Sequence, residues 1–200
     1  MSTAAATAHY TSTGQDTRKI AFWTFIGSEC LLFGSLIATY LAYEGKSVVG
    51  PTPEEILNIP LTSVSTFVLL MSSLAMVLAL AAVTTGQTRH TRIWLATTAG
   101  LGAIFLGFQA WEFTSFVHEG LTVSTNLFGS TFFVLTGCHG LHVAVGVIWL
   151  TTLLILSFRG KLGPEKAMNV EIAGLYWHFV DVVWIVIFTV VYLIQRGPAA

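Results

Sequence analysis

Six ionisable residues stand inside stretches that are otherwise apolar enough to sit in lipid. They are Glu29, Glu112, His139, His142, His178 and Asp181. Such side chains are costly at membrane depth, so each must face protein, a partner or water. Two kinds of chemistry are open to them: the histidines ligate a haem or a metal ion, or the polar groups hydrogen-bond neighbouring helices together.

Helix depth argues against the ligand role. At a rise of about 1.5 Å per residue, His142 lies roughly 25 Å and His178 about 10 Å from the inner edge, a gap of about 15 Å that disfavours a haem between them. His139 and His142 are spaced to share a helix face. Zinc, however, requires three or four ligands, and no cysteine or carboxylate clearly completes that set. We interpret these imidazoles as hydrogen-bonding groups between helices or towards a partner.

The last apolar run contains an acid and a base three residues apart, His178 and Asp181. This spacing predicts that the imidazole and the carboxylate meet on one helix face and offset each other's desolvation. Trp177 and Trp184 share the face of Asp181, and we interpret that aromatic stripe as packing or lipid contact.

The two glutamates differ in depth. Glu29 lies roughly 15 Å from the inner edge, near the midplane, whereas Glu112 stands close to the outer interface. No basic residue of its own helix is near Glu29, so it is either protonated or paired across the bundle. His142 is a candidate partner, although the two depth estimates differ by about 10 Å.

The elements that position these residues are membrane helices. The chain has 200 residues, of which 54% are hydrophobic and 10% charged, whereas soluble domains carry about 25% charged residues. The fold class is an all-α integral membrane protein, and five apolar runs reach the roughly 20 residues needed to cross a bilayer. They span residues 20–43, 61–83, 93–116, 127–158 and 172–194, so that a five-helix domain covers 20–195.

The polar segment 1–19 lacks the features of a signal peptide, so the first helix is expected to remain as an anchor. Seven basic residues fall on the side of the amino terminus: Arg18, Lys19, Arg89, Arg92, Arg159, Lys161 and Lys166. The opposite side has only Lys46 and Arg196. Because basic loops stay inside, the amino terminus is expected in the cytoplasm and the carboxyl terminus outside. A net charge of −1 gives no indication of a nucleic-acid partner.

Small residues at helical spacing predict close helix packing. They are Ala99, Ala103 and Gly107 in the third run, Gly140 and Ala144 in the fourth, and Gly27 and Gly34 in the first. Cys30 and Cys138 lie in apolar runs, where a structural thiol is the ordinary interpretation.

Four sequence blocks resemble one family. "SECLLF" in the first run, "QAWEF" in the third, "FGSTFFVLTGCHGLHV" in the fourth and "YWHFVDVVW" in the fifth are similar to subunit III of the haem-copper terminal oxidases, the cytochrome c oxidase and quinol oxidase superfamily. The resemblance extends from Arg18 to Ile194. Larger members have seven helices, and this chain resembles the five-helix bacterial form.

The resemblance implies a non-catalytic subunit of a proton-translocating respiratory oxidase in the bacterial plasma membrane. Such a subunit has no cofactor of its own; haem and copper lie in partner subunits. It packs mainly on subunit I, alongside subunit II and others, binds phospholipid, and supports stability and proton uptake. By the same resemblance, the six buried residues match the family's motif positions, and Arg159 is a candidate for holding a lipid phosphate. An ordinary positive-inside anchor is the alternative role for Arg159.

The resemblance favours cytochrome c as electron donor, with a quinol oxidase subunit as the alternative. A small membrane cytochrome would need haem in the isolated chain. A transporter would need a polar path through its own bundle. A purely structural assembly subunit differs only in leaving proton uptake unchanged.

Overall fold

The computed structural model describes residues 16–47, 50–51 and 53–194. Within these residues the chain is helical, and five helices are long and apolar enough to cross a membrane, which confirms the expected number. They are α1 (Thr17–Tyr43), α3 (Ile59–Thr84), α4 (Thr88–His118), α5 (Leu127–Phe158) and α6 (Ala167–Phe188). A π-helical turn (Thr189–Leu193) extends α6, while α2 (Pro53–Ile56) and a 3-10 turn (Pro164–Lys166) lie in connections.

Local signals at the helix ends explain where the helices begin and end. The side chains of Asn58 and Asn126 accept hydrogen bonds from the backbone N–H of Leu61 and Gly129, at 3.1 and 2.7 Å, and so cap α3 and α5. Immediately after α3, α4 and α5 the chain reverses at glycines with φ of 73°, 87° and 67°, a backbone conformation that favours glycine. The polar first turn of α4 stands outside the apolar run, so the helix begins before the expected residue 93.

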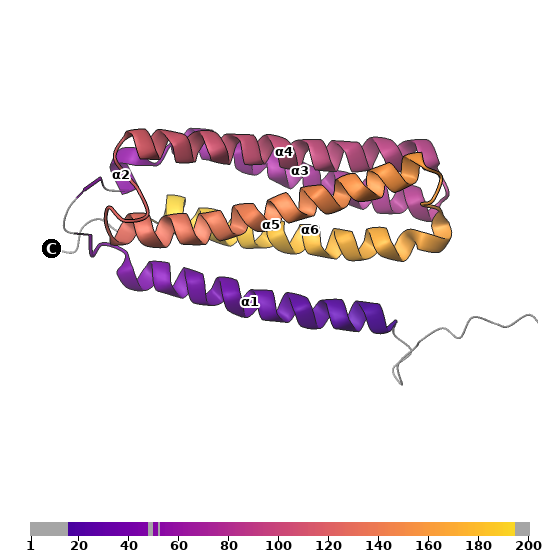
Figure 1. Cartoon of the computed structure of the whole chain (residues 1–200), viewed down its shortest axis with the longest axis horizontal. Coiled ribbons are helices and arrows are strands. Elements are labelled where there is room, and N and C mark those ends of the chain that lie inside the picture. The colour runs from indigo at the N-terminus through magenta and orange to yellow at the C-terminus, as the bar shows by residue number, and fades with distance from the viewer. Residues whose placement is uncertain (1–15, 48–49, 52, 195–200) are drawn as a thin grey trace, which may run out of the picture.

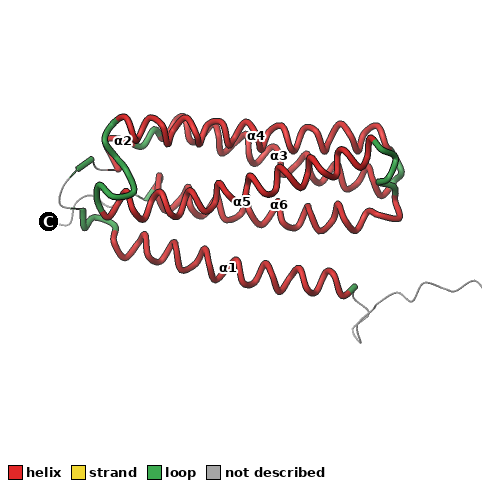
Figure 2. Tube along the Cα trace, in the orientation of Figure 1, coloured by secondary structure: helices red, strands yellow, loops and turns green. Residues whose placement is uncertain are grey.

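Helices α3, α4, α5 and α6 form a four-helix bundle, and α1 lies along its side against α5 and α6 (Figure 1). The tube in Figure 2 shows that all the long helices run nearly parallel or antiparallel. The inward residues of α1 follow a heptad-like spacing, namely Phe22, Ile26, Glu29, Phe33, Leu36 and Tyr40. Apart from the partly buried Lys19 and Ile37, the rest of α1 is exposed, with Leu31 at 78%. Helix α1 therefore docks through a single narrow stripe.

A buried indole sets the spacing of three helices in the bundle. Trp177 on α6 is 0% exposed. A Cβ added to Gly102 on α4 or to Gly146 on α5 would lie only 2.5 or 2.7 Å from its ring. The indole N–H donates to the Ser72 hydroxyl on α3 at 2.9 Å. Trp177 thus links α6 to all three other bundle helices, and the two glycines leave room for it.

Within the described chain, the small-residue prediction is confirmed at Ala99, which is 8% exposed, and at Gly140, whereas three of the glycines that it named make no such contact. A Cβ on Gly140 would lie 2.6 Å from Gln109, so this glycine does allow α4 and α5 to approach. At Gly27, Gly34 and Gly107 an added Cβ would meet nothing within 4 Å. These three glycines face away from the rest of the described chain. Spacing along one helix does not tell which face turns inward.

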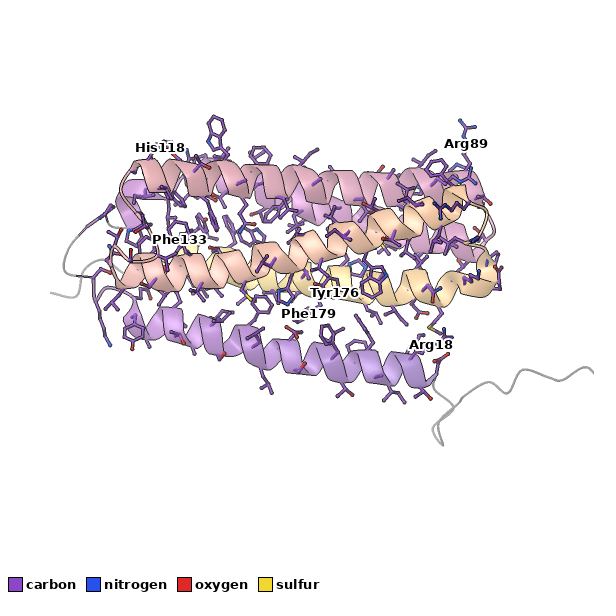
Figure 3. The ribbon with its side chains drawn as sticks, viewed as in Figure 1. Arg18, Arg89, His118, Phe133, Tyr176 and Phe179 are labelled. Carbon is purple, nitrogen blue, oxygen red and sulfur yellow. The ribbon has the colours of Figure 1, made fainter. Side chains whose placement is uncertain are left out.

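The described chain begins at one end of the bundle and ends at the other, as an odd number of crossings requires (Figure 1). Arg18 and Arg89 lie at the same end, and His118 lies at the opposite end (Figure 3). The predicted grouping of basic residues at one end is therefore present for these labelled residues.

Candidate functional site

The most distinctive polar contact joins α1 to α5. The Nε2 of His142 lies 3.1 Å from Oε2 of Glu29. Both side chains are largely buried, with exposures of 18% and 15%. Because no other acid or base of α1 faces the bundle at this depth, the contact compensates the desolvation of both groups. The pairing that the sequence offered as one alternative for Glu29 is confirmed.

The hydrogen bonds of His142 determine how many protons the pair holds. Its Nδ1 lies 2.8 Å from the carbonyl oxygen of Cys138. A carbonyl can only accept, so Nδ1 carries a hydrogen. One further proton then lies between Nε2 and the Glu29 carboxyl. The pair is either imidazolium with carboxylate or imidazole with carboxylic acid, and both forms are neutral overall.

This pair borders an apolar groove of about 570 Å³. The groove is lined by Phe22, Phe25, Glu29, Leu141, His142, Val145, Trp149 and Tyr176. Tyr176 and Phe179 project from α6 towards α1 (Figure 3). The Tyr176 hydroxyl donates to the backbone carbonyl of His142 at 2.9 Å. One wall of the groove is thus aromatic, and its polar border is the Glu29–His142 pair.

The depth estimates for His142 are wrong. The Phe33 ring lies 5.0 Å from the His142 ring and 6.3 Å from the ring of Phe179, so His142 is close in depth to the residue after His178. The reason is that α5 extends beyond the start of α1 at the end of the bundle where α1 begins, as Figure 1 shows. Counting inward from Arg159 therefore placed His142 too far from that edge.

His142 and His178 nevertheless face different helices. The Nδ1 of His178 lies 2.6 Å from the Ser73 hydroxyl on α3, whereas His142 faces Glu29 on α1. Within the described residues, no group of three or more His, Cys, Asp and Glu is placed to hold a metal ion.

The predicted contact between His178 and Asp181 is not found. His178 bonds to Ser73 instead, and both carboxylate oxygens of Asp181 lack a hydrogen-bond partner among the described residues. Asp181 is 3% exposed and lies on the face of α6 that turns into the bundle. The spacing along α6 brings His178 and Asp181 near one another, but the imidazole of His178 bonds to Ser73 on α3.

A row of hydroxyl groups joins α3 to α6. The hydroxyl of Ser72 donates to a carbonyl of its own helix and accepts from the indole of Trp177. Thr66 has the same arrangement with Trp184 at 2.9 Å. Since each hydroxyl hydrogen is held by the backbone and an indole can only donate, this row binds helices together and does not relay protons.

The remaining predicted residues lie apart. Glu112 accepts from the Thr62 hydroxyl at 2.8 Å and also contacts Tyr192. His139 is 0% exposed and stacks on Trp184, with 4.8 Å between ring centroids and an angle of 26°. Arg159 is exposed in the turn after α5. The structure therefore brings together only Glu29 and His142 among the predicted residues.

The sequence interpretation missed one contact between α4 and α5, at the end of the bundle where α4 begins. The guanidinium of Arg92 donates to the carbonyl of Ser157 at 2.9 Å and lies 5.0 Å from the ring centroid of Phe158. It satisfies a carbonyl at the end of α5 and fixes that end to α4. The sequence did contain a signal for this contact. Arg92 lies one turn into α4, where a basic side chain can reach the last carbonyls of a neighbouring helix.

Comparison with known proteins relates this arrangement to one family. The family described as cytochrome c oxidase subunit III matches residues 1–196. A cytochrome c oxidase subunit 3 of Bacillus sp. (strain PS3) is 44% identical over 174 residues, covering 87% of this chain and 84% of the relative. A quinol oxidase subunit 3 of Bacillus subtilis (strain 168) is 42% identical over 178 residues, covering 89% and 87%. A cytochrome c oxidase subunit 3 of the same strain is 42% identical over 175 residues, covering 87% and 84%.

Proposed function

The chain belongs to the cytochrome c oxidase subunit III family and is a multi-pass subunit of a respiratory terminal oxidase of the bacterial plasma membrane, and we propose that it has no catalytic centre of its own. It supports the stability of the oxidase, binds lipid and assists proton uptake into subunit I, its main contact. Subunit II and other oxidase subunits complete the assembly. The observation that carries this proposal is the Glu29–His142 pair at the border of an apolar groove.

Haem and copper are assigned to the partner subunits. This assignment is supported by the contacts of the three motif histidines, each of which packs on or bonds to a side chain of another helix. His142 contacts Glu29, His178 contacts Ser73, and His139 stacks on Trp184. These contacts fit roles in holding helices together.

The groove supports phospholipid binding. Its walls are apolar and aromatic, and about 570 Å³ accommodates part of an acyl chain. Arg159 is exposed at the inner end of α5, where a lipid phosphate can approach it. The basic residues at this end support an orientation with the amino terminus in the cytoplasm and the carboxyl terminus outside.

The Glu29–His142 pair supports a part in proton uptake. It holds one transferable proton within the membrane-spanning region without net charge in either form. Moving that proton between Nε2 and the carboxyl leaves the pair neutral, whereas net uptake or release gives the pair a charge and therefore requires contact with water or with a partner group. Because the groove is apolar, we assign this contact to a polar group of subunit I that approaches the pair where it borders the groove.

The electron donor of the complex is proposed to be cytochrome c, with quinol as the alternative. Relatives named after either donor are similar to the chain, at 44% and 42% identity. Donor oxidation by the purified complex separates the two. Oxidation of reduced cytochrome c supports the first, and oxidation of quinol alone supports the alternative.

The experiment that tests the proposal is a gentle detergent purification through a tag on this chain, followed by subunit identification and an optical spectrum before and after dissociation. Haem is expected to co-purify with larger subunits and to leave with them. Haem that stays on the isolated chain would make this subunit a cytochrome and overturn the proposal. Proton uptake that is unchanged on removal of the subunit would leave a purely structural assembly role.

A further inference from the structure

One serine of α3 differs from the other hydroxyl side chains of its helix. The structure describes every residue of α3, and the other serines and threonines each have a backbone carbonyl of the preceding turn as acceptor, namely Thr62, Ser63, Ser65, Thr66, Ser72 and Thr84. Ser73 instead has its Oγ 2.6 Å from Nδ1 of His178 on α6. The hydroxyl hydrogen of Ser73 is therefore not committed to its own helix.

A buried carboxylate lies beside the same hydroxyl. Asp181 stands three residues after His178, so the two side chains lie on one face of α6, and Ser73 is next to both. Asp181 is 3% exposed, and neither of its carboxylate oxygens has a hydrogen-bond partner among the described residues. An unpaired carboxylate in an apolar core is costly. When the Ser73 hydroxyl turns to Asp181, it supplies the donor that this carboxylate lacks.

His178 connects this arrangement to the edge of the bundle. Its side chain is partly exposed, and its Nε2 is not buried and has no partner among the described residues. The polar groups thus follow one another from an accessible imidazole nitrogen, through Ser73, to a buried carboxylate. They lie on the α3 side of α6, whereas the groove beside Glu29 and His142 is lined by α1, α5 and α6.

No fixed cation compensates a negative charge on Asp181. Helix α3 contains no titratable side chain, and the only lysines or arginines of the four bundle helices, Arg89 and Arg92, lie at the start of α4. Of the histidines of α5, His139 stacks on an indole and His142 contacts α1. The carboxyl of Asp181 is therefore favoured in its neutral, protonated form, and its proton must arrive through a neighbouring group.

We propose that His178, Ser73 and Asp181 form a proton relay, in which Ser73 passes a proton between the accessible imidazole and the buried carboxyl. With Asp181 ionised, the Ser73 hydroxyl donates to the carboxylate, and Nδ1–H of His178 donates to the Ser73 oxygen. A proton that binds Nε2 releases the Nδ1 proton to Ser73, and the earlier hydroxyl proton of Ser73 passes to Asp181. The product is a carboxylic acid beside a neutral imidazole in its other tautomer, so one proton is stored and no other bond changes.

The order of the three groups distinguishes this relay from a nucleophilic triad. In a triad the imidazole stands between the serine and the carboxylate and activates the hydroxyl. Here the serine stands in the middle, where a hydroxyl both accepts and donates a hydrogen bond, as a relay requires. The relay gives the subunit a second proton-holding group, separate from the Glu29–His142 pair.

Infrared spectroscopy of the complex purified through a tag on this chain tests the relay at the carboxylic acid itself. The wild type should show a carboxylic acid C=O band that is absent in Asp181→Asn and that shifts as deuterium replaces the proton in heavy water. Ser73→Ala should slow this exchange by about 100-fold or more, the lower end of what a positioned proton donor contributes. Ser73→Thr keeps a hydroxyl and should retain rapid exchange, as should Ser63→Ala, which removes a hydroxyl that bonds only its own helix.

A second variant and a control separate the relay from other roles. His178→Gln, whose amide still bonds Ser73 but cannot pass a proton on, should slow the exchange as much as Ser73→Ala. Glu29→Gln should alter neither the band nor its exchange, so this test does not depend on the role proposed for the Glu29–His142 pair. A wild-type spectrum without a band that depends on Asp181 overturns the proposal. Equally fast exchange in Ser73→Ala also overturns it and leaves Ser73 as a link between two helices only.

Discussion

Replacing Gly102 by alanine tests whether the indole of Trp177 sets the spacing of the bundle. The new Cβ would lie 2.5 and 2.8 Å from two ring atoms of Trp177 and 2.9 Å from a methyl group of Val147. Ordinary contacts between carbon atoms begin near about 3.5 Å. Trp177 or α4 must therefore move by about 1 Å, and the indole is also held by Ser72.

The expected magnitude combines two opposing terms. Overpacking of a well-packed core costs about 1–3 kcal/mol. Alanine is the better helix former and returns about 0.5–1 kcal/mol relative to glycine. Gly102→Ala is therefore expected to be destabilising by up to about 2.5 kcal/mol, whereas Gly107→Ala, whose Cβ meets nothing within 4 Å, should be neutral or slightly stabilising.

The assay is thermal unfolding of the purified chain in detergent, followed by circular dichroism. For a chain of this size about 1 kcal/mol corresponds to about 2–4 °C in Tm. Gly102→Ala should thus melt several degrees below Gly107→Ala. Adding Trp177→Phe to Gly102→Ala should recover part of the loss caused by the alanine. Equal Tm values for the two alanine variants would refute the idea that Trp177 spaces the helices.

Three further predictions concern polar contacts. Glu29→Gln should slow proton uptake by the complex, because the amide still bonds the imidazole of His142 but cannot exchange the proton. The amount of haem per complex should be unchanged, and loss of haem with all subunits present would contradict this. Ser73→Ala should lower stability by about 0.6–1.5 kcal/mol by removing a partner of His178, measured by the same melting assay, with Ser63→Ala on the exposed side as control. Hydrogen bonds from Arg18 hold the pKa of Asp16 below its ordinary value. The ionised cap is therefore fully present above the ordinary pKa of an aspartate, about 3.9, and is lost as the pH falls through the lowered one. The protection of amide hydrogens in the first turn of α1, relative to their intrinsic exchange rates at each pH, should fall as the pH is lowered below about 4 in the wild type but not in Asp16→Asn, and identical protection in both would contradict it.

The helices could be predicted from the sequence because apolar length is a direct requirement of the bilayer. The importance of Glu29 and His142 was predictable for a related reason, since ionisable groups at membrane depth demand compensation. The pairing of Glu29 with His142 is a property of the tertiary structure. It depends on how far α5 extends past α1, and a count of residues along each helix separately cannot supply that offset.

The choice of partner for His178 was not predictable from spacing. Asp181 stands one turn away on the same helix, but Ser73 on another helix bonds the imidazole. Likewise, Gly102 and Gly146 make room for Trp177, while the glycines that the spacing singled out in α1 face outward. Helix periodicity groups residues by face, and only the packed bundle decides which face each neighbour occupies.

The stripe of α1 that packs on α5 and α6 has a consequence for synthesis. Glu29 is made 113 residues before the histidine that pairs with it. At about 5–20 residues per second, translation separates them by about 6–23 s. During that interval the first helix resides in the bilayer with its acidic side chain uncompensated. The pair cannot form until α5, the fourth of the five long helices, has been made, and α6 is then still to be added.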